Sequence, residues 1–129
     1  MKNILEKLKS HILELEKEHG PFIMFAMFLR EEPLEKWDIL VSASWLSNSQ
    51  MESYRLIAEM IQNTLKDQEI IQISRIVILN SDDPVVSYLQ DNFPVTNGGY
   101  KEVPCEQLSS HFGFSIEKAL VLRSQKIAV

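Results

Sequence analysis

The stretch that decides the fold is Phe22-Ile23-Met24-Phe25-Ala26-Met27-Phe28-Leu29, in which every residue is apolar. A strand with one face in water alternates apolar and polar residues, whereas a strand covered on both faces is continuously apolar. The stretch therefore predicts a strand inside a sheet, with other elements packed on both of its faces. It is the longest apolar run of the chain and far too short to cross a bilayer as a helix, so we expect no membrane partner.

The segment before this strand predicts an amphipathic helix. Its apolar residues recur at steps of three and four positions, and charged residues occupy most of the places between them. Gly20-Pro21 predicts the end of the helix, because glycine adopts the left-handed conformation that closes a helix and proline cannot continue one. The apolar stripe consists of Ile4, Leu5, Leu8, Ile12 and Leu15.

A short charged connection, residues 30–36, separates the apolar stretch from a second predicted strand, Trp37–Ala43. A connection of this length joins antiparallel strands, because a parallel pair needs a much longer crossover. We therefore expect the two strands to form a hairpin.

Residues 49–65 predict a second helix. Ser49-Gln50-Met51-Glu52 has the pattern of a capping box, in which a serine and a glutamate side chain satisfy backbone N–H groups of the first turn. The stripe that we expect to be buried consists of Met51, Tyr54, Ile57, Ala58, Ile61 and Leu65.

The second half of the chain is less regular. Ile70–Leu79 predicts a third strand, which we interpret as another inner strand because its second half is continuously apolar. Asp83 and Pro84 suit the N-cap and the first residue of a short helix. Tyr100–Val103 predicts an edge strand, since Pro104 follows it. Residues 115–123 suit either a helix or a strand.

These elements predict one α+β domain that spans residues 1–129. Their order is helix, strand, strand, helix, strand, helix and then a β-containing tail. We expect a mixed sheet of about four or five strands with helices packed on it.

The charge and cysteine content narrow the classes of function. The chain has 18 acidic and 13 basic residues, a formal charge of −5, and the basic residues are scattered. Nucleic-acid binding depends on clustered cations, so we expect no nucleic-acid partner. The single cysteine, Cys105, cannot form an internal disulfide, and charges interrupt the first residues where a signal peptide would be apolar. We therefore expect a soluble, cytoplasmic protein.

The sequence contains no recognisable catalytic, metal or cofactor motif, so we predict none of the three. His11 and His19 lie eight positions apart on the first helix, about 12 Å along its axis, and cannot share a metal ion. Cys105 is near His111, but its flanking residues match no protease or redox signature. Glycine-rich phosphate-binding loops are absent.

Three aspartates, at two places in the chain, are candidate binding residues. Asp38 is a carboxylate near the start of an apolar strand, and we interpret it as the ion-pair partner of Arg30 or Lys36 at the sheet margin. Asp82 and Asp83 follow the third strand, where they would cap the next helix or attract a cation rather than a phosphate. If the third strand runs parallel to the second, Asp38 and Asp82 lie at opposite ends of the sheet.

The order of the first helix, Gly20-Pro21, the apolar strand, the charged connection and Trp37–Val41 resembles the opening of a minimal nucleotidyltransferase domain over about forty residues. In that family a Gly-Ser pair follows the first strand, and two aspartates one residue apart on the second strand hold magnesium. Here no Gly-Ser pair follows the strand, and Leu40 stands where a second carboxylate would follow Asp38. The resemblance implies a degenerate nucleotidyltransferase-like protein or another nucleotide-binding protein.

Trp45-Leu46 places two large apolar side chains in a predicted surface loop. They would either anchor a partner or fold back to close the end of the core. Our main hypothesis is a small non-enzymatic binding or regulatory module that acts as a homodimer or with a protein partner. Edge strands in the tail offer a second route to self-association. The nucleotide-binding protein described above is the alternative.

Overall fold

A computed structural model of the chain describes residues 2–30, 36–96, 99–112 and 115–126. It is an α+β fold with a five-stranded mixed sheet, as the sequence predicts, and its elements follow the predicted order. The elements are α1 (Lys2–His19), β1 (Met24–Arg30), β2 (Trp37–Ser42), α2 (Met51–Thr64), α3 (Asp67–Ile70), β3 (Ile73–Ile78), α4 (Pro84–Asn92), β4 (Lys101–Val103), α5 (Glu106–Phe112) and β5 (Ile116–Ser124).

The strands are arranged in the order β3-β2-β1-β5-β4. β1 pairs antiparallel with β2 on one side and with β5 on the other, so it occupies the centre of the sheet. β2 and β3 are parallel, and α2 lies in the crossover between them. The apolar stretch predicted that β1 lies inside the sheet, and the short connection after it predicted the β1–β2 hairpin; the structure confirms both.

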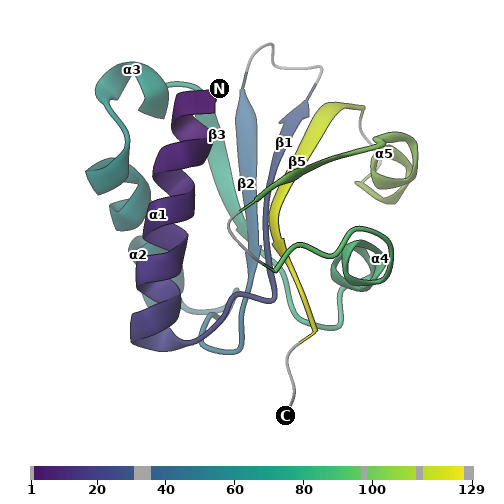
Figure 1. The fold of residues 1–129 in the computed structure, drawn as a ribbon, viewed down its shortest axis with the longest axis horizontal. Coiled ribbons are helices and arrows are strands. Elements are labelled where there is room, and N and C mark those ends of the chain that lie inside the picture. The colour runs from purple at the N-terminus through teal and green to yellow at the C-terminus, as the bar shows by residue number, and fades with distance from the viewer. Residues whose placement is uncertain (1, 31–35, 97–98, 113–114, 127–129) are drawn as a thin grey trace.

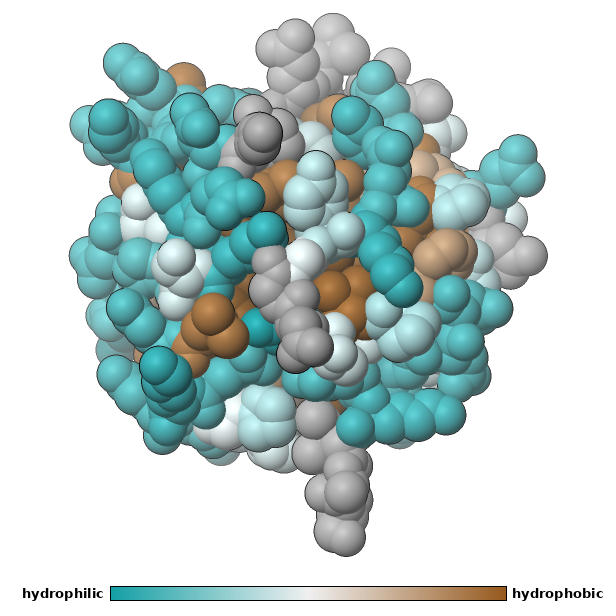
Figure 2. All heavy atoms as spheres, in the orientation of Figure 1, coloured by the Kyte–Doolittle hydropathy of each residue, from teal (hydrophilic) through white to brown (hydrophobic). Residues whose placement is uncertain are grey.

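The helices form two layers, one on each face of the sheet (Figure 1). α1 and α2 pack on the face that carries Phe25 and Met27 of β1. α4 covers the face that carries Ala26 and Phe28. Because alternate residues of β1 enter two different cores, every position from 24 to 28 is buried. On the surface in Figure 2, hydrophilic residues dominate and hydrophobic residues gather mainly in the middle, between the two helical layers.

The end of α1 follows the sequence prediction. Gly20 has a φ of 116°, a left-handed conformation that residues with a side chain rarely adopt, and its N–H donates to the carbonyl oxygen of Glu16 at 2.9 Å. Trp45 also lies against this glycine, since a Cβ added there would be 3.5 Å from the indole ring. The chain therefore turns sharply from α1 into β1 at a position that glycine alone fits well.

Two expectations about α2 are wrong. The helix begins at Met51, one residue later than the capping box requires, and its N-cap Gln50 makes no side-chain capping hydrogen bond. The Ser49 hydroxyl is instead 2.9 Å from that of Ser47, whose N–H donates to Ser53 Oγ. Met51, expected in the buried stripe, is 67% exposed. The local hydrogen bonds of the loop thus replace the cap, and the first residue of α2 lies outside the core.

The prediction that the third strand is an inner strand is also wrong. β3 is an edge strand, begins at Ile73 rather than Ile70, and is preceded by the short helix α3. Its apolar residues are only partly buried, apart from Ile78. The ambiguity at residues 115–123 is resolved as strand β5, which lies between β1 and β4, and β4 is the predicted edge strand.

Candidate functional site

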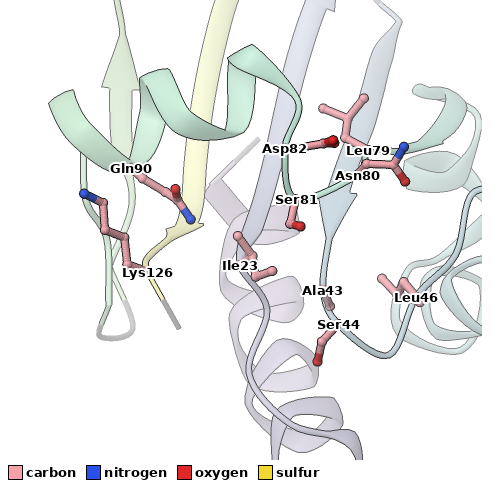
Figure 3. A pocket seen from close by; sticks show the side chains of 10 residues that line it. All are labelled: Ile23, Ala43, Ser44, Leu46, Leu79, Asn80, Ser81, Asp82, Gln90 and Lys126. Carbon is pink, nitrogen blue, oxygen red and sulfur yellow. The ribbon is translucent and has the colours of Figure 1, made fainter. Parts of the chain in front are cut away.

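A cavity of about 700 Å³ opens at the end of the sheet where β2 and β3 finish (Figure 3). The loop that follows β2 and the loop that follows β3 form much of its wall. Residues before β1, on α4 and after β5 complete the wall. The lining residues are Ile23, Ala43, Ser44, Leu46, Leu79, Asn80, Ser81, Asp82, Gln90 and Lys126.

The path of the chain explains why a cavity forms here. After β2 the chain turns to α2, which packs on the same face as α1. After β3 it turns to α4, which packs on the opposite face. A crevice forms at the carboxyl ends of two neighbouring parallel strands when the helices that follow them pack on opposite faces of the sheet. Open α/β sheets commonly bind ligands in such a crevice.

The lining combines an apolar wall with neutral polar groups. Ile23, Leu46 and Leu79 supply apolar surface, and the hydroxyl of Ser81 points into the space between the two loops (Figure 3). The side-chain amide of Gln90 donates to the carbonyl oxygen of Gln125 at 2.9 Å, which leaves its amide oxygen able to accept a hydrogen bond. Lys126 lies at the rim, with its ammonium group 3.1 Å from the Asp91 carboxylate.

The structure separates the two aspartates that follow β3. Asp83 is the N-cap of α4, as predicted, and its Oδ1 accepts the Val85 N–H at 2.9 Å. Pro84 is the first helical residue, also as predicted. Asp82 is exposed and lines the cavity. Of the two residues, Asp82 is therefore the one that a molecule in the cavity could contact.

Asp38 lies at the opposite end of the sheet, as expected for parallel β2 and β3. It is 1% exposed, and its Oδ2 is 3.1 Å from Nε of Arg30 and 3.2 Å from Nε of Arg75. The pairing with Arg30 was predicted, whereas Lys36 donates instead to the carbonyl oxygen of Ile71. Arg75 was missed, because only the parallel register of β2 and β3 places it beside Asp38. This ion-pair cluster joins β1, β2 and β3.

Trp45 folds back on the protein rather than projecting from it. Its indole N–H donates to the Gly20 carbonyl oxygen at 3.0 Å, and its ring stacks on His19 with the centroids 4.9 Å apart. The ring centroid of Phe22 is 5.0 Å away. Of the two readings of this loop, the contacts match the one in which Trp45 closes the end of the core, while Leu46 lines the cavity.

A second buried ion pair was not foreseen from the sequence. Arg123 of β5 is 2% exposed, and its Nε donates to Glu16 Oε1 of α1 at 3.1 Å. Glu16 Oε2 accepts the Phe22 N–H at 2.9 Å. Both residues carry the charges typical of a surface, and nothing in the local pattern indicates that they meet. The pair fixes α1 against β5.

Cys105 is partly buried, and burial raises the pKa of its thiol, with a further increase from the nearby carboxylate of Glu102. A raised pKa means less thiolate at neutral pH and therefore a less reactive side chain. Among the described residues, no group of three or more histidine, cysteine, aspartate or glutamate side chains could hold a metal ion. The side chain of His111 lies outside the described part of the chain.

We expect native Cys105 to react with iodoacetamide more slowly at pH 7 than the same residue in guanidinium-unfolded protein. Its rate should rise at a more alkaline pH than that of the unfolded chain, because the folded thiol has the higher pKa. Mass spectrometry of timed samples measures both rates. A native rate equal to or above the unfolded rate at pH 7 would contradict this expectation.

No protein-family model, curated protein or solved structure matches the chain. Within the described residues, none of the helices has the length and apolar composition needed to cross a membrane.

Proposed function

We propose that this chain is a small non-enzymatic binding or regulatory module that takes a small polar molecule in the cavity at the carboxyl ends of β2 and β3. The observation that carries the proposal is the position of the cavity, between loops that leave two parallel strands toward opposite faces of the sheet. The serine hydroxyls, amides and apolar side chains of the lining suit an uncharged or weakly charged molecule better than a phosphate.

The composition of the lining supports binding rather than catalysis. Its titratable residues are Asp82 and Lys126, and the ammonium group of Lys126 is already paired with Asp91. The described lining contains no histidine or cysteine. It therefore lacks the side chains that most often pair as general base and nucleophile. We place the module in the cytoplasm on the basis of its single cysteine.

A panel of sugars, amino acids and short carboxylic acids, assayed by thermal shift, tests this proposal. We expect at least one compound to raise the melting temperature of the wild type and of Ser10→Trp, a control with the same change on an exposed position of α1. Ser44→Trp should abolish the shift, because the indole would project into the cavity and block part of it. A shift that survives in Ser44→Trp, or no shift with any compound, would count against the cavity as the binding site.

Nucleotide binding remains the second candidate, because the first two strands resemble those of a minimal nucleotidyltransferase. The structure offers it less support: two guanidinium groups occupy Asp38 Oδ2, and Leu40 is buried in the core beside α4. ATP with magnesium should leave the melting temperature of the wild type unchanged. A rise that disappears in Asp38→Asn would favour the nucleotide-binding protein instead.

A further inference from the structure

We propose that two copies of this chain associate through the outer edge of β3 and the flank of α2 beside it. β3 pairs with β2 alone among the described strands. The Leu79 N–H donates to the Val41 carbonyl oxygen at 2.8 Å. Because the direction of backbone groups alternates along a strand, Ile76 and Ile78 direct their N–H and C=O groups away from β2. These groups can pair with another strand.

The two edge strands, β4 and β3, differ in how well they are protected against pairing with a strand of another chain. β4 has three residues, of which Lys101 and Glu102 are charged, and Pro104 follows it. Short length, charge and proline are the usual protection of an edge strand. β3 has six residues, contains no proline and carries the single charge of Arg75. The long apolar edge is therefore the unprotected one.

The flank of α2 beside this edge is also apolar. Ile57 and Ile61 are buried against the sheet, and Leu56 and Met60 line a groove shared with α1. Helical periodicity places Met51, Tyr54 and Ala58 on the remaining flank, away from α1. Met51 is 67% exposed, and the other two are partly exposed. The apolar stripe that the sequence predicted to be buried thus includes residues that the core of one chain leaves exposed.

We group the helix flank and the strand edge as the α2–β3 surface. Ile71, two residues before the start of β3, is 65% exposed. Ile73 and Ile76 are partly buried against the core that α2 covers. The apolar members of this surface are Met51, Tyr54, Ala58, Ile71, Ile73 and Ile76.

A second copy fits this edge if a two-fold axis relates it to the first. The axis is perpendicular to the sheet and passes between the two copies of Ile76. The two β3 strands then pair antiparallel, with Ile76 opposite Ile76, Ser74 opposite Ile78 and Arg75 opposite Val77. Centring the pair on Arg75 would place like charges directly opposite each other, which is unfavourable. The register at Ile76 avoids this and uses almost the whole length of β3.

The same axis brings the two α2 helices together. α2 contacts β3 and forms the crossover between β2 and β3. With neighbouring strands about 4.8 Å apart, a helix centred above these two strands lies about 10 Å from its copy across the two-fold axis. That is close to the distance at which helices pack. An isolated foreign strand could pair with β3 but would leave the flank of α2 uncovered. The whole α2–β3 surface therefore points to a second copy of this chain.

Light scattering across a concentration series tests the association. We expect the wild type to reach twice its 14.9 kDa mass. Met51→Lys and Ile71→Lys should raise the dissociation constant at least 10-fold, because each places a charge in the buried surface. Leu13→Lys is the matched control, since Leu13 is an apolar residue of α1 with 45% exposure away from the α2–β3 surface. A monomeric wild type, or an equal effect of all three variants, would overturn the proposal.

Cysteine cross-linking tests the register in a Cys105→Ser background. Ile76→Cys lies on the two-fold axis, where the opposing α-carbons of a hydrogen-bonded pair are about 5.5 Å apart, within the range that a disulfide spans, so oxidation should give a cross-linked dimer. Val77→Cys should not cross-link, because the two copies of residue 77 are displaced along the strands. Equal cross-linking of both variants, or none of Ile76→Cys, would overturn this arrangement. Circular dichroism melting curves of each variant establish that it is folded.

Discussion

Replacing Asp38 by alanine is expected to lower the free energy of unfolding by about 3 kcal/mol, as is typical when one partner of a buried ion pair is removed. Asp38 is buried, and the side chains of Arg30 and Arg75 converge on the same carboxylate oxygen. Without the carboxylate, the two guanidinium groups lose the negative charge that holds them beside each other. Urea unfolding followed by tryptophan fluorescence measures the loss.

Asp91→Ala is the control, since Asp91 also forms an ion pair, with Lys126, but both of its members are exposed. Exposed pairs contribute at most about 1 kcal/mol, so this variant should remain close to the wild type. Equal losses for Asp38→Ala and Asp91→Ala would show that the ion-pair cluster at β1, β2 and β3 does not stabilise the sheet margin.

Glu16→Ala is expected to lower the free energy of unfolding by about 3–5 kcal/mol, because it removes the carboxylate that pairs with a buried arginine. Arg123 is 2% exposed, so solvent stabilises its guanidinium group little in the native structure. The variant also removes the acceptor of the Phe22 N–H at the start of the central strand. Urea unfolding measures this change. A lower midpoint with an unchanged denaturant slope would establish that the variant lowers the free energy of unfolding and leaves the unfolded state unaltered.

The double variant Glu16→Leu with Arg123→Met tests whether the charges or the packing matter. Apolar replacements of a buried pair are often neutral or stabilising, although the unpaired Phe22 N–H still costs about 1–3 kcal/mol. The double variant should therefore be more stable than Glu16→Ala. If it is less stable than Glu16→Ala, the pair contributes through its own interaction energy and not by avoiding a lone buried charge.

Local signals in the sequence predict most of the elements correctly. The continuous apolar stretch identifies β1 as central, and the glycine and proline that follow α1 identify its end. Asp83 and Pro84 identify the start of α4. Each of these patterns depends on residues within a few positions of one another, which is why a sequence alone reveals them.

The features that sequence analysis missed depend on residues far apart in the chain. Arg75 reaches Asp38 only through the register of two parallel strands, and Arg123 reaches Glu16 only after β5 pairs with β1. The cavity depends on the divergence of α2 and α4, which no single segment encodes. The position of β3 at the edge likewise follows from the strand order, whereas its composition suggests an inner strand.

The position of β5 beside the central strand β1 governs how the chain can fold. β1 needs β5 as its second neighbour, yet Phe25 and its partner Arg123 are separated by most of the chain. Contacts over such a separation slow folding, because a long loop must close before the contacts form. During synthesis the residues of β1 and β2 are made before those of β5, so a β1–β2 hairpin that forms at that stage has the outer side of β1 open. The nascent protein therefore carries its most apolar strand as a temporary edge, and β5 removes that edge when it pairs.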